Sequence, residues 1–136
     1  MKNFFKNTVI IAPHPDDETI GLGGTIKKLV KNSIKVSILI VSGHMPPLYS
    51  ENEYKRTLNE SKKVFKLLGV NDYKFLNIPA TKINELPVST LNKKINDFIK
   101  KRKPNTIFIP FLDRHIDHRI VFDSSIVSSR PIGKSF

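Results

Sequence analysis

The stretch IIAPHPDDETIGLGG, residues 10–24, joins the end of an apolar run to a histidine, three acids and then a helical pattern. A short apolar run rich in β-branched residues predicts a buried strand, here Thr8 to Ala12. The segment from Thr19 to Lys31 predicts a helix directly after it. Acidic residues crowd this strand exit although the chain carries a formal net charge of +11. The stretch therefore predicts a strand, loop and helix in which the loop carries chemistry.

The same order of elements repeats along the chain. Apolar runs predict three further strands at residues 34–41, 74–78 and 106–110, and helical periodicity predicts helices that end at Gly69, before Pro104 and near Ser129. The last of these helices is expected to begin near His118. Strands that alternate with helices build right-handed crossovers and a parallel sheet covered on both faces. We therefore expect a single Rossmann-like α/β domain over residues 1–136.

Composition limits the class of protein and the class of site. A length of 136 residues suits one domain, and the absence of cysteine excludes disulfides and thiolate metal sites. The 23 Lys and Arg residues outnumber the 12 acids but are scattered, and their densest run, Lys100 to Lys103, closes a predicted helix where cations complement the helix dipole. We expect a solvated basic surface and no nucleic-acid partner. No apolar run suits a signal peptide or a membrane span, so we expect a cytoplasmic protein.

Two polar clusters follow two different predicted strands. His14 to Glu18 follows the first strand, and Asp113 to His118 follows the fourth. If the strands lie in the common order 3-2-1-4, the first and fourth are neighbours, and a crevice opens beyond their carboxyl ends. The topology thus brings together residues that are about a hundred positions apart in the sequence, as a Rossmann-like crossover does.

These clusters contain the donors of a catalytic metal site. Asp16 or Asp17 could serve as an ordinary helix N-cap, but His14 beside them supplies an imidazole and a carboxylate for one pocket. Two imidazoles and one carboxylate leave an open coordination position, which is typical of catalytic zinc and of metal-activated water. A free carboxylate could then act as general base and an opposite histidine could stabilise an oxyanion or protonate an amine, with Asp117 orienting that histidine. This set suits hydrolysis of an amide or an ester, and spacing alone leaves open which aspartate is the ligand.

The chain also resembles a known family, the PIG-L/LmbE-like zinc-dependent N-acetylglucosaminyl deacetylases. The residues PHPDDE at 13–18 and HIDH at 115–118 match its two motifs in the same order. RTLNESKKVFKLLGV at 56–70 and SSRPIG at 128–133 resemble its intervening helix and its later segment. Members of the family usually continue beyond the position of Phe136, so we expect a sheet that is short at its C-terminal end.

The resemblance implies a function and a role for each matching residue. It implies one zinc ion per chain, with Fe(II) or another divalent metal as the alternative, and removal of acetyl from an N-acetylglucosamine-type sugar or glycoconjugate. The implied roles are metal ligands at His14, Asp17 and His118, a general base at Asp16, an oxyanion stabiliser or acid at His115, an orienting carboxylate at Asp117 and a substrate contact at Arg56. An open sheet edge also favours self-association of the chain.

Three other interpretations remain open at this stage. His14, Asp16 and His118 would also form the triad of a non-haem iron enzyme, although that chemistry usually sits on all-β scaffolds. A metallo-β-lactamase-like hydrolase would need a histidine where this chain has Asp113. A catalytically silent, truncated protein or a basic binding module would hold no metal and would bind an anionic partner in a salt-sensitive way.

Overall fold

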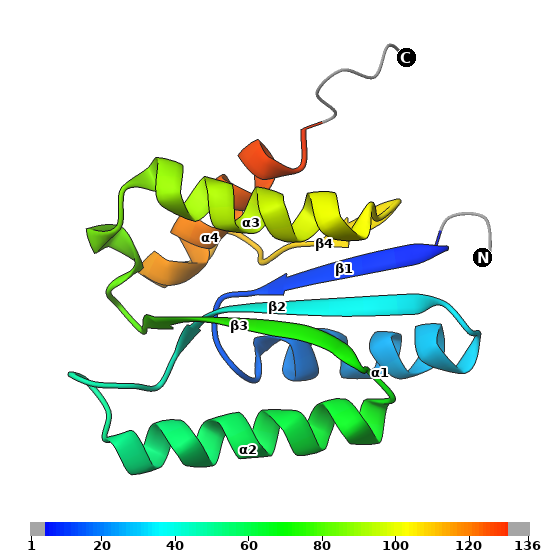
Figure 1. Cartoon of the computed structure of the whole chain (residues 1–136), viewed down its shortest axis with the longest axis horizontal. Coiled ribbons are helices and arrows are strands. Elements are labelled where there is room, and N and C mark those ends of the chain that lie inside the picture. Colours follow the sequence, from blue (N-terminus) through cyan, green and yellow to red (C-terminus); the bar gives the residue numbers. More distant parts are fainter. Residues whose placement is uncertain (1–4, 131–136) are drawn as a thin grey trace.

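The centre of the molecule is a four-stranded parallel sheet (Figure 1). The computed structural model describes residues 5–130 of the 136. Within them the strands are β1 (Asn7–Ala12), β2 (Lys35–Gly43), β3 (Asp72–Pro79) and β4 (Thr106–Phe108). They lie in the order β3-β2-β1-β4, so the predicted order is confirmed.

Helices cover both faces of this sheet, as the alternation of elements predicts. The helices are α1 (Asp17–Lys31), α2 (Glu51–Leu68), the short 3₁₀ helix η1 (Ile83–Glu85), α3 (Val88–Arg102) and α4 (Ile116–Ser128). In Figure 1, α1 and α2 lie on one side of the sheet, and α3 and α4 lie on the other. The expectation of a Rossmann-like α/β fold is confirmed. The ends of the predicted domain, residues 1–4 and 131–136, lie outside the described residues, as does the end of the SSRPIG segment.

Each face of the sheet has its own apolar core. Successive side chains of a strand point to opposite faces, so β1 sends Val9 and Ile11 to the core under α3 and α4, and Ile10 and Ala12 to the core under α1 and α2. All four side chains are buried. A strand buried on both faces is mostly apolar, and residues 9–12 of β1 are all apolar.

The ends of α2 show how local sequence sets the helix bounds. Ser50 and Glu53 form a reciprocal capping box at its start. Gly69 ends it in the left-handed conformation, with φ 85°. A Cβ at this position would lie 2.8 Å from Cγ1 of Val30 on α1, so glycine is required both for the turn and for the contact between α1 and α2.

The structure refines two local features of the helices. The helix α4 begins at Ile116, near His118 as expected, and His115 is its N-cap. The glycines of the GLGG run lie in the first turns of α1, and a Cβ at Gly21 or Gly24 would meet nothing within 4 Å. These glycines therefore do not mark a close contact.

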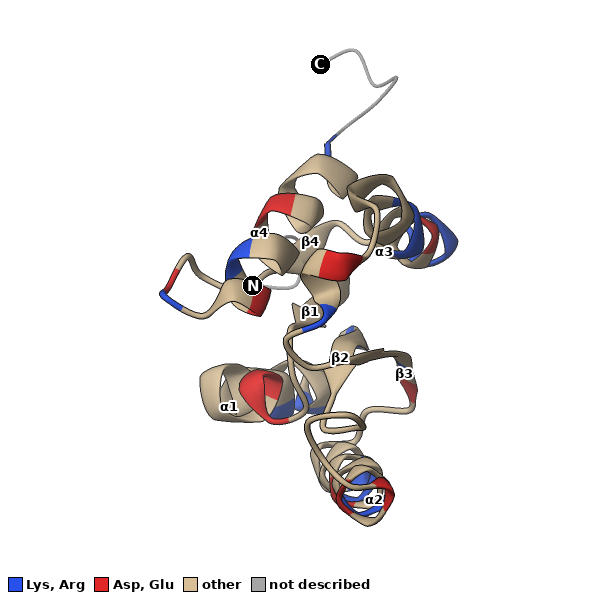
Figure 2. Ribbon diagram, turned by 90° about the vertical axis from the view of Figure 1, so that its left-hand side faces the viewer, with Lys and Arg blue, Asp and Glu red and all other residues tan. Residues whose placement is uncertain are grey.

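The charged residues are spread over several helices. Figure 2 shows Lys and Arg on α1, α2 and α3, with Asp and Glu interleaved on α2. Among the helices of residues 5–130, none has the length and apolar character needed to cross a bilayer.

Candidate active site

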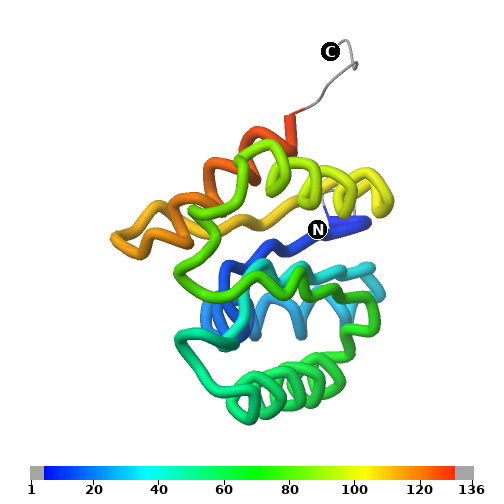
Figure 3. The backbone as a smooth tube through the Cα atoms, turned by 60° about the vertical axis from the view of Figure 1, so that its left-hand side comes forward, coloured from blue at the N-terminus to red at the C-terminus, as the bar shows by residue number. Residues whose placement is uncertain are grey.

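The loop after β1 and the loop after β4 meet at the carboxyl end of the sheet. Figure 3 shows both loops at the same end of the molecule. The first loop is fixed because Ser42 of β2 donates two hydrogen bonds to the carbonyl of Pro13, from its amide at 2.8 Å and from its hydroxyl at 2.9 Å. The next amide, that of His14, donates to Oδ2 of Asp17 at 2.9 Å. The backbone therefore directs the first polar cluster towards the start of α4.

Three donor atoms from the two loops lie almost equally far apart. Nδ1 of His14 is 3.2 Å from Nε2 of His118, and each of these nitrogens is 3.3 Å from Oδ2 of Asp17. Donors bound tetrahedrally to one metal at about 2.0–2.1 Å are about 3.3 Å from one another. The spacing and the chemistry of these three donors therefore fit a metal ion without rearrangement.

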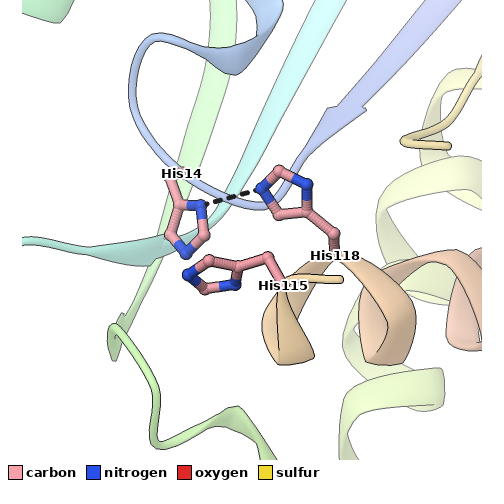
Figure 4. Close-up of side chains that lie close together, drawn as sticks. All are labelled: His14, His115 and His118. Atoms are coloured by element: carbon pink, nitrogen blue, oxygen red, sulfur yellow. Dashed lines mark hydrogen bonds between the residues drawn. The ribbon is translucent and has the colours of Figure 1, made fainter. Parts of the chain in front are cut away.

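A looser group of three histidines shares this site. Donor atoms of His14, His115 and His118 all lie within 4.8 Å of one another, and Figure 4 shows their rings converging. The ring of His115 stands edge-on to that of His14, with centroids 4.7 Å apart. The donors that include Asp17 are more tightly spaced than the three-histidine group, so they fit a metal better.

Asp117 contacts a different histidine from the one expected. Its buried carboxylate accepts a hydrogen bond from Nε2 of His14 at 2.9 Å and another from the amide of Thr81 at 2.8 Å. The ring of His115 instead accepts, at Nδ1, a hydrogen bond from the backbone amide of Asp117 at 3.2 Å. The expectation that the Asp117 carboxylate orients His115 is therefore corrected, because that carboxylate orients His14.

The carboxylates around His14 govern its charge. Burial by itself would lower the pKa of His14, but hydrogen bonds to Asp117 and Asp17 outweigh it and raise the pKa to about 9. Burial likewise opposes ionisation of Asp17, yet its hydrogen bonds to His14 lower its pKa overall. Without a metal, the centre of the site is thus a protonated imidazole between two carboxylates.

Asp16 occupies a strained position at the start of α1. It is the N-cap residue with φ 121° and ψ −31°, and its side chain makes no capping hydrogen bond. Although the residue is exposed, the pKa of its carboxyl is raised. The main cause is partial desolvation of the carboxyl, and the second is the nearby negative charge of Asp17. The backbone thus directs this carboxylate away from the usual capping role.

Two cavities border the site. One, of about 350 Å³, lies between α1 and α2, and its lining includes Asp16, His44 and Arg56. The other, of about 290 Å³, is largely apolar and has Asp17 and His118 in its wall. Arg56 is exposed on α2, with its guanidinium 4.0 Å from the carboxylate of Glu60. The structure thus brings Arg56 to the same cavity as Asp16 and places it outside the histidine cluster.

One residue beside the histidines received no role from the sequence. Asp113 accepts hydrogen bonds from Nδ1 of His118 at 2.7 Å and from the amide of His115 at 2.8 Å. Its place two residues before the first histidine of the HIDH motif is the signal that could have found it, since aspartates commonly cap the backbone two residues ahead.

Comparison with known proteins places the chain in a family. The family model described as PIG-L, GlcNAc-PI de-N-acetylase, matches residues 9–127. The diacetylchitobiose deacetylase of Thermococcus kodakarensis is 36% identical over 134 residues, which cover 86% of this chain and 46% of the relative. The chain thus spans about half the length of this curated relative.

Solved structures show the same fold. The N,N'-diacetylchitobiose deacetylase of Pyrococcus horikoshii, complexed with an inhibitor, superposes with a TM-score of 0.80 at 31% identity and covers 93% of this chain and 50% of its own. The 4-carboxy-2-hydroxymuconate hydratase of Pseudomonas putida superposes with a TM-score of 0.77 at 12% identity, covering 90% of this chain and 55% of its own. The second likeness shows the fold alone. Because the family model spans nearly all of the described residues, the chain belongs to the PIG-L family of GlcNAc-PI de-N-acetylases.

Proposed function

We propose that this chain carries the metal centre of a zinc-dependent N-deacetylase, which releases acetate from an N-acetylated amino sugar and leaves a free amine. The observation that carries the proposal is the triangle of donor atoms from His14, Asp17 and His118, with sides of 3.2 to 3.3 Å. Two imidazoles and one carboxylate form the donor set of a catalytic zinc site with an open position.

The proposed ligands are His14, Asp17 and His118, and the ring of His115 lies beside them. Zinc at this site would supply a Lewis acid for the amide carbonyl and would increase the acidity of water. The metal is proposed as zinc because imidazole and carboxylate donors at tetrahedral spacing suit it.

Asp16 is the proposed general base. Its carboxylate follows the loop that holds His14, is not part of the donor triangle and borders the cavity between α1 and α2. The raised pKa brings this carboxyl closer to the pH at which it can both accept a proton from water and return one. Arg56 lines the same cavity with five guanidinium N–H donors, which suits a contact to sugar hydroxyls.

His115 is the proposed hydrogen-bond donor to the reacting group. Because its Nδ1 accepts a hydrogen bond from the amide of Asp117, the neutral ring carries its proton on Nε2. This N–H can donate a hydrogen bond to the carbonyl oxygen as negative charge develops there. The residue is exposed at the start of α4, so a substrate can reach it.

The names of the relatives support an N-acetylated sugar as substrate. Two are described as diacetylchitobiose deacetylases, and they are 36% and 31% identical to this chain. The fold by itself gives weaker support, since a hydratase shares it at 12% identity. The proposal therefore rests on the donor triangle and on the relatives with higher identity.

The test is release of acetate by the zinc-loaded chain from N-acetylglucosamine and from N,N'-diacetylchitobiose. We expect release that Asp16→Asn reduces by about 100-fold or more, because removal of a general base typically costs 10²–10⁴. Zinc content should be equal in the two proteins, which separates loss of the base from loss of the metal. Absence of acetate from a fully zinc-loaded wild-type chain with both sugars would contradict the proposed reaction.

A further inference from the structure

The outer nitrogen of each proposed metal-ligating histidine contacts a carboxylate. Nε2 of His14 contacts Asp117 at 2.9 Å, and Nδ1 of His118 contacts Asp113 at 2.7 Å. Asp117 is fully buried, whereas the side chain of Asp113 is 49% exposed and lies in the loop between β4 and α4. The two contacts are chemically alike although they occur in different surroundings.

An ionised carboxylate can only accept hydrogen bonds, so each contact fixes the position of a proton on a ring. His118 must carry a proton on Nδ1 to donate to Asp113. In the neutral ring its Nε2 then keeps a free lone pair, and this nitrogen is the one that lies 3.3 Å from Oδ2 of Asp17. The contact with Asp113 therefore selects the tautomer in which His118 can bind a metal.

The second oxygen of Asp113 fixes the backbone next to the ring. Oδ1 accepts a hydrogen bond from the amide of His115, the N-cap residue of α4, at 2.8 Å. One carboxylate thus holds both the start of the helix and the ring of His118 in its first turn. A group that binds in this two-point way sets the direction of the ring as well as its tautomer.

We propose that Asp113 is a positioning residue that holds His118 in the tautomer and orientation needed for metal binding. This inference rests on the proposed function, because it takes His118 as a ligand of the metal. Carboxylate partners of ligating histidines typically contribute about 10- to 100-fold to metal affinity. Asp113 would therefore act on the metal through His118 without touching it.

Asp113→Asn separates this role from simple support of the loop. The amide oxygen of asparagine can still accept from the amide of His115, so the start of α4 is retained. Its NH₂ group, however, would donate to Nδ1 of His118 and move the ring proton to Nε2, the nitrogen that faces Asp17. The variant should fold normally and present the wrong tautomer to the metal.

The experiment measures Zn²⁺ affinity by competition with a chelator in the wild-type chain, in Asp113→Asn and in Asp123→Asn. Asp123 is exposed on α4, the helix that carries His118, so its variant makes the same change of charge away from the site. We expect about 10- to 100-fold weaker zinc binding in Asp113→Asn and wild-type affinity in Asp123→Asn. Imidazole ¹⁵N NMR of the metal-free proteins at a pH where the rings are neutral should show the His118 proton on Nδ1 in the wild type and on Nε2 in Asp113→Asn.

The outcomes separate this inference from the proposed function. A wild-type chain that binds zinc, together with an Asp113→Asn variant of equal affinity or unchanged His118 tautomer, would overturn the positioning role alone. Equal weakening in Asp113→Asn and Asp123→Asn would also overturn it, because a general effect of charge would then explain the result. A wild-type chain that binds no zinc would overturn the proposed metal centre itself.

Discussion

The protonated state of His14 makes the stability of the metal-free chain depend on pH in a direction that can be calculated. Contacts with Asp117 and Asp17 raise the pKa of His14 from an ordinary 6.5 to about 9 in the folded protein. A raised pKa stabilises the fold fully below the unfolded value of 6.5, and this contribution is lost as pH rises through about 9. The difference between the two pKa values corresponds to about 3 kcal/mol.

The assay is urea unfolding of the chain in the presence of a chelator at pH 6, 7.5 and 9.5. We expect the free energy of unfolding to fall by about 3 kcal/mol between the first and last pH, with most of the loss above pH 6.5. His14→Gln is the control, because it removes the titrating ring and should show a much flatter profile. A wild-type profile as flat as that of His14→Gln, or one that rises with pH, would refute the assignment of a charged His14 between the two carboxylates.

Three further predictions follow from single positions. Because Asp16 has φ 121°, Asp16→Gly should be more stable than Asp16→Ala by about 1 kcal/mol in thermal unfolding, and equal stabilities would argue against strain at this residue. Leu91 is 1% exposed and lies in the core under α3, so Leu91→Ala should lower the free energy of unfolding in urea by about 2–5 kcal/mol. A decrease under 1 kcal/mol would place Leu91 outside the core. Zinc affinity should rise about tenfold per pH unit between pH 6.5 and 8.5 because the metal displaces the proton of His14, and a pH-independent affinity in calorimetry would contradict that exchange.

The order of the strands could be predicted from the sequence because strands, helices and turns each have a local sequence pattern, and general rules limit how parallel strands connect. The strands β1 and β2 are buried along nearly their whole length and are mostly apolar, as burial on both faces favours. Gly69 ends α2 where its left-handed conformation is needed. Since crossover connections between parallel strands are right-handed, only a few strand orders are possible for these elements. One of these orders brings the two polar loops together.

The contacts of individual side chains within the site could not be predicted in the same way. His115 has extended backbone angles, φ −74° and ψ 127°, and stands outside α4, so the helical spacing to Asp117 does not apply to it. The carboxylate of Asp117 points into the protein and contacts His14, which lies in the loop after β1. These two residues are 103 positions apart in the sequence. A pattern of residue types shows which groups gather at a strand end, but the choice of partner among adjacent histidines depends on the turn that begins the helix.

The most direct test of the metal centre is the zinc content of the purified, dialysed chain, measured by elemental analysis beside His118→Ala. The proposed ligands predict about one zinc per chain in the wild type and loss of that zinc in the variant, with both proteins folded by circular dichroism. Little or no zinc in the wild type after zinc is added back, or an undiminished content in His118→Ala, would contradict the site formed by His14, Asp17 and His118.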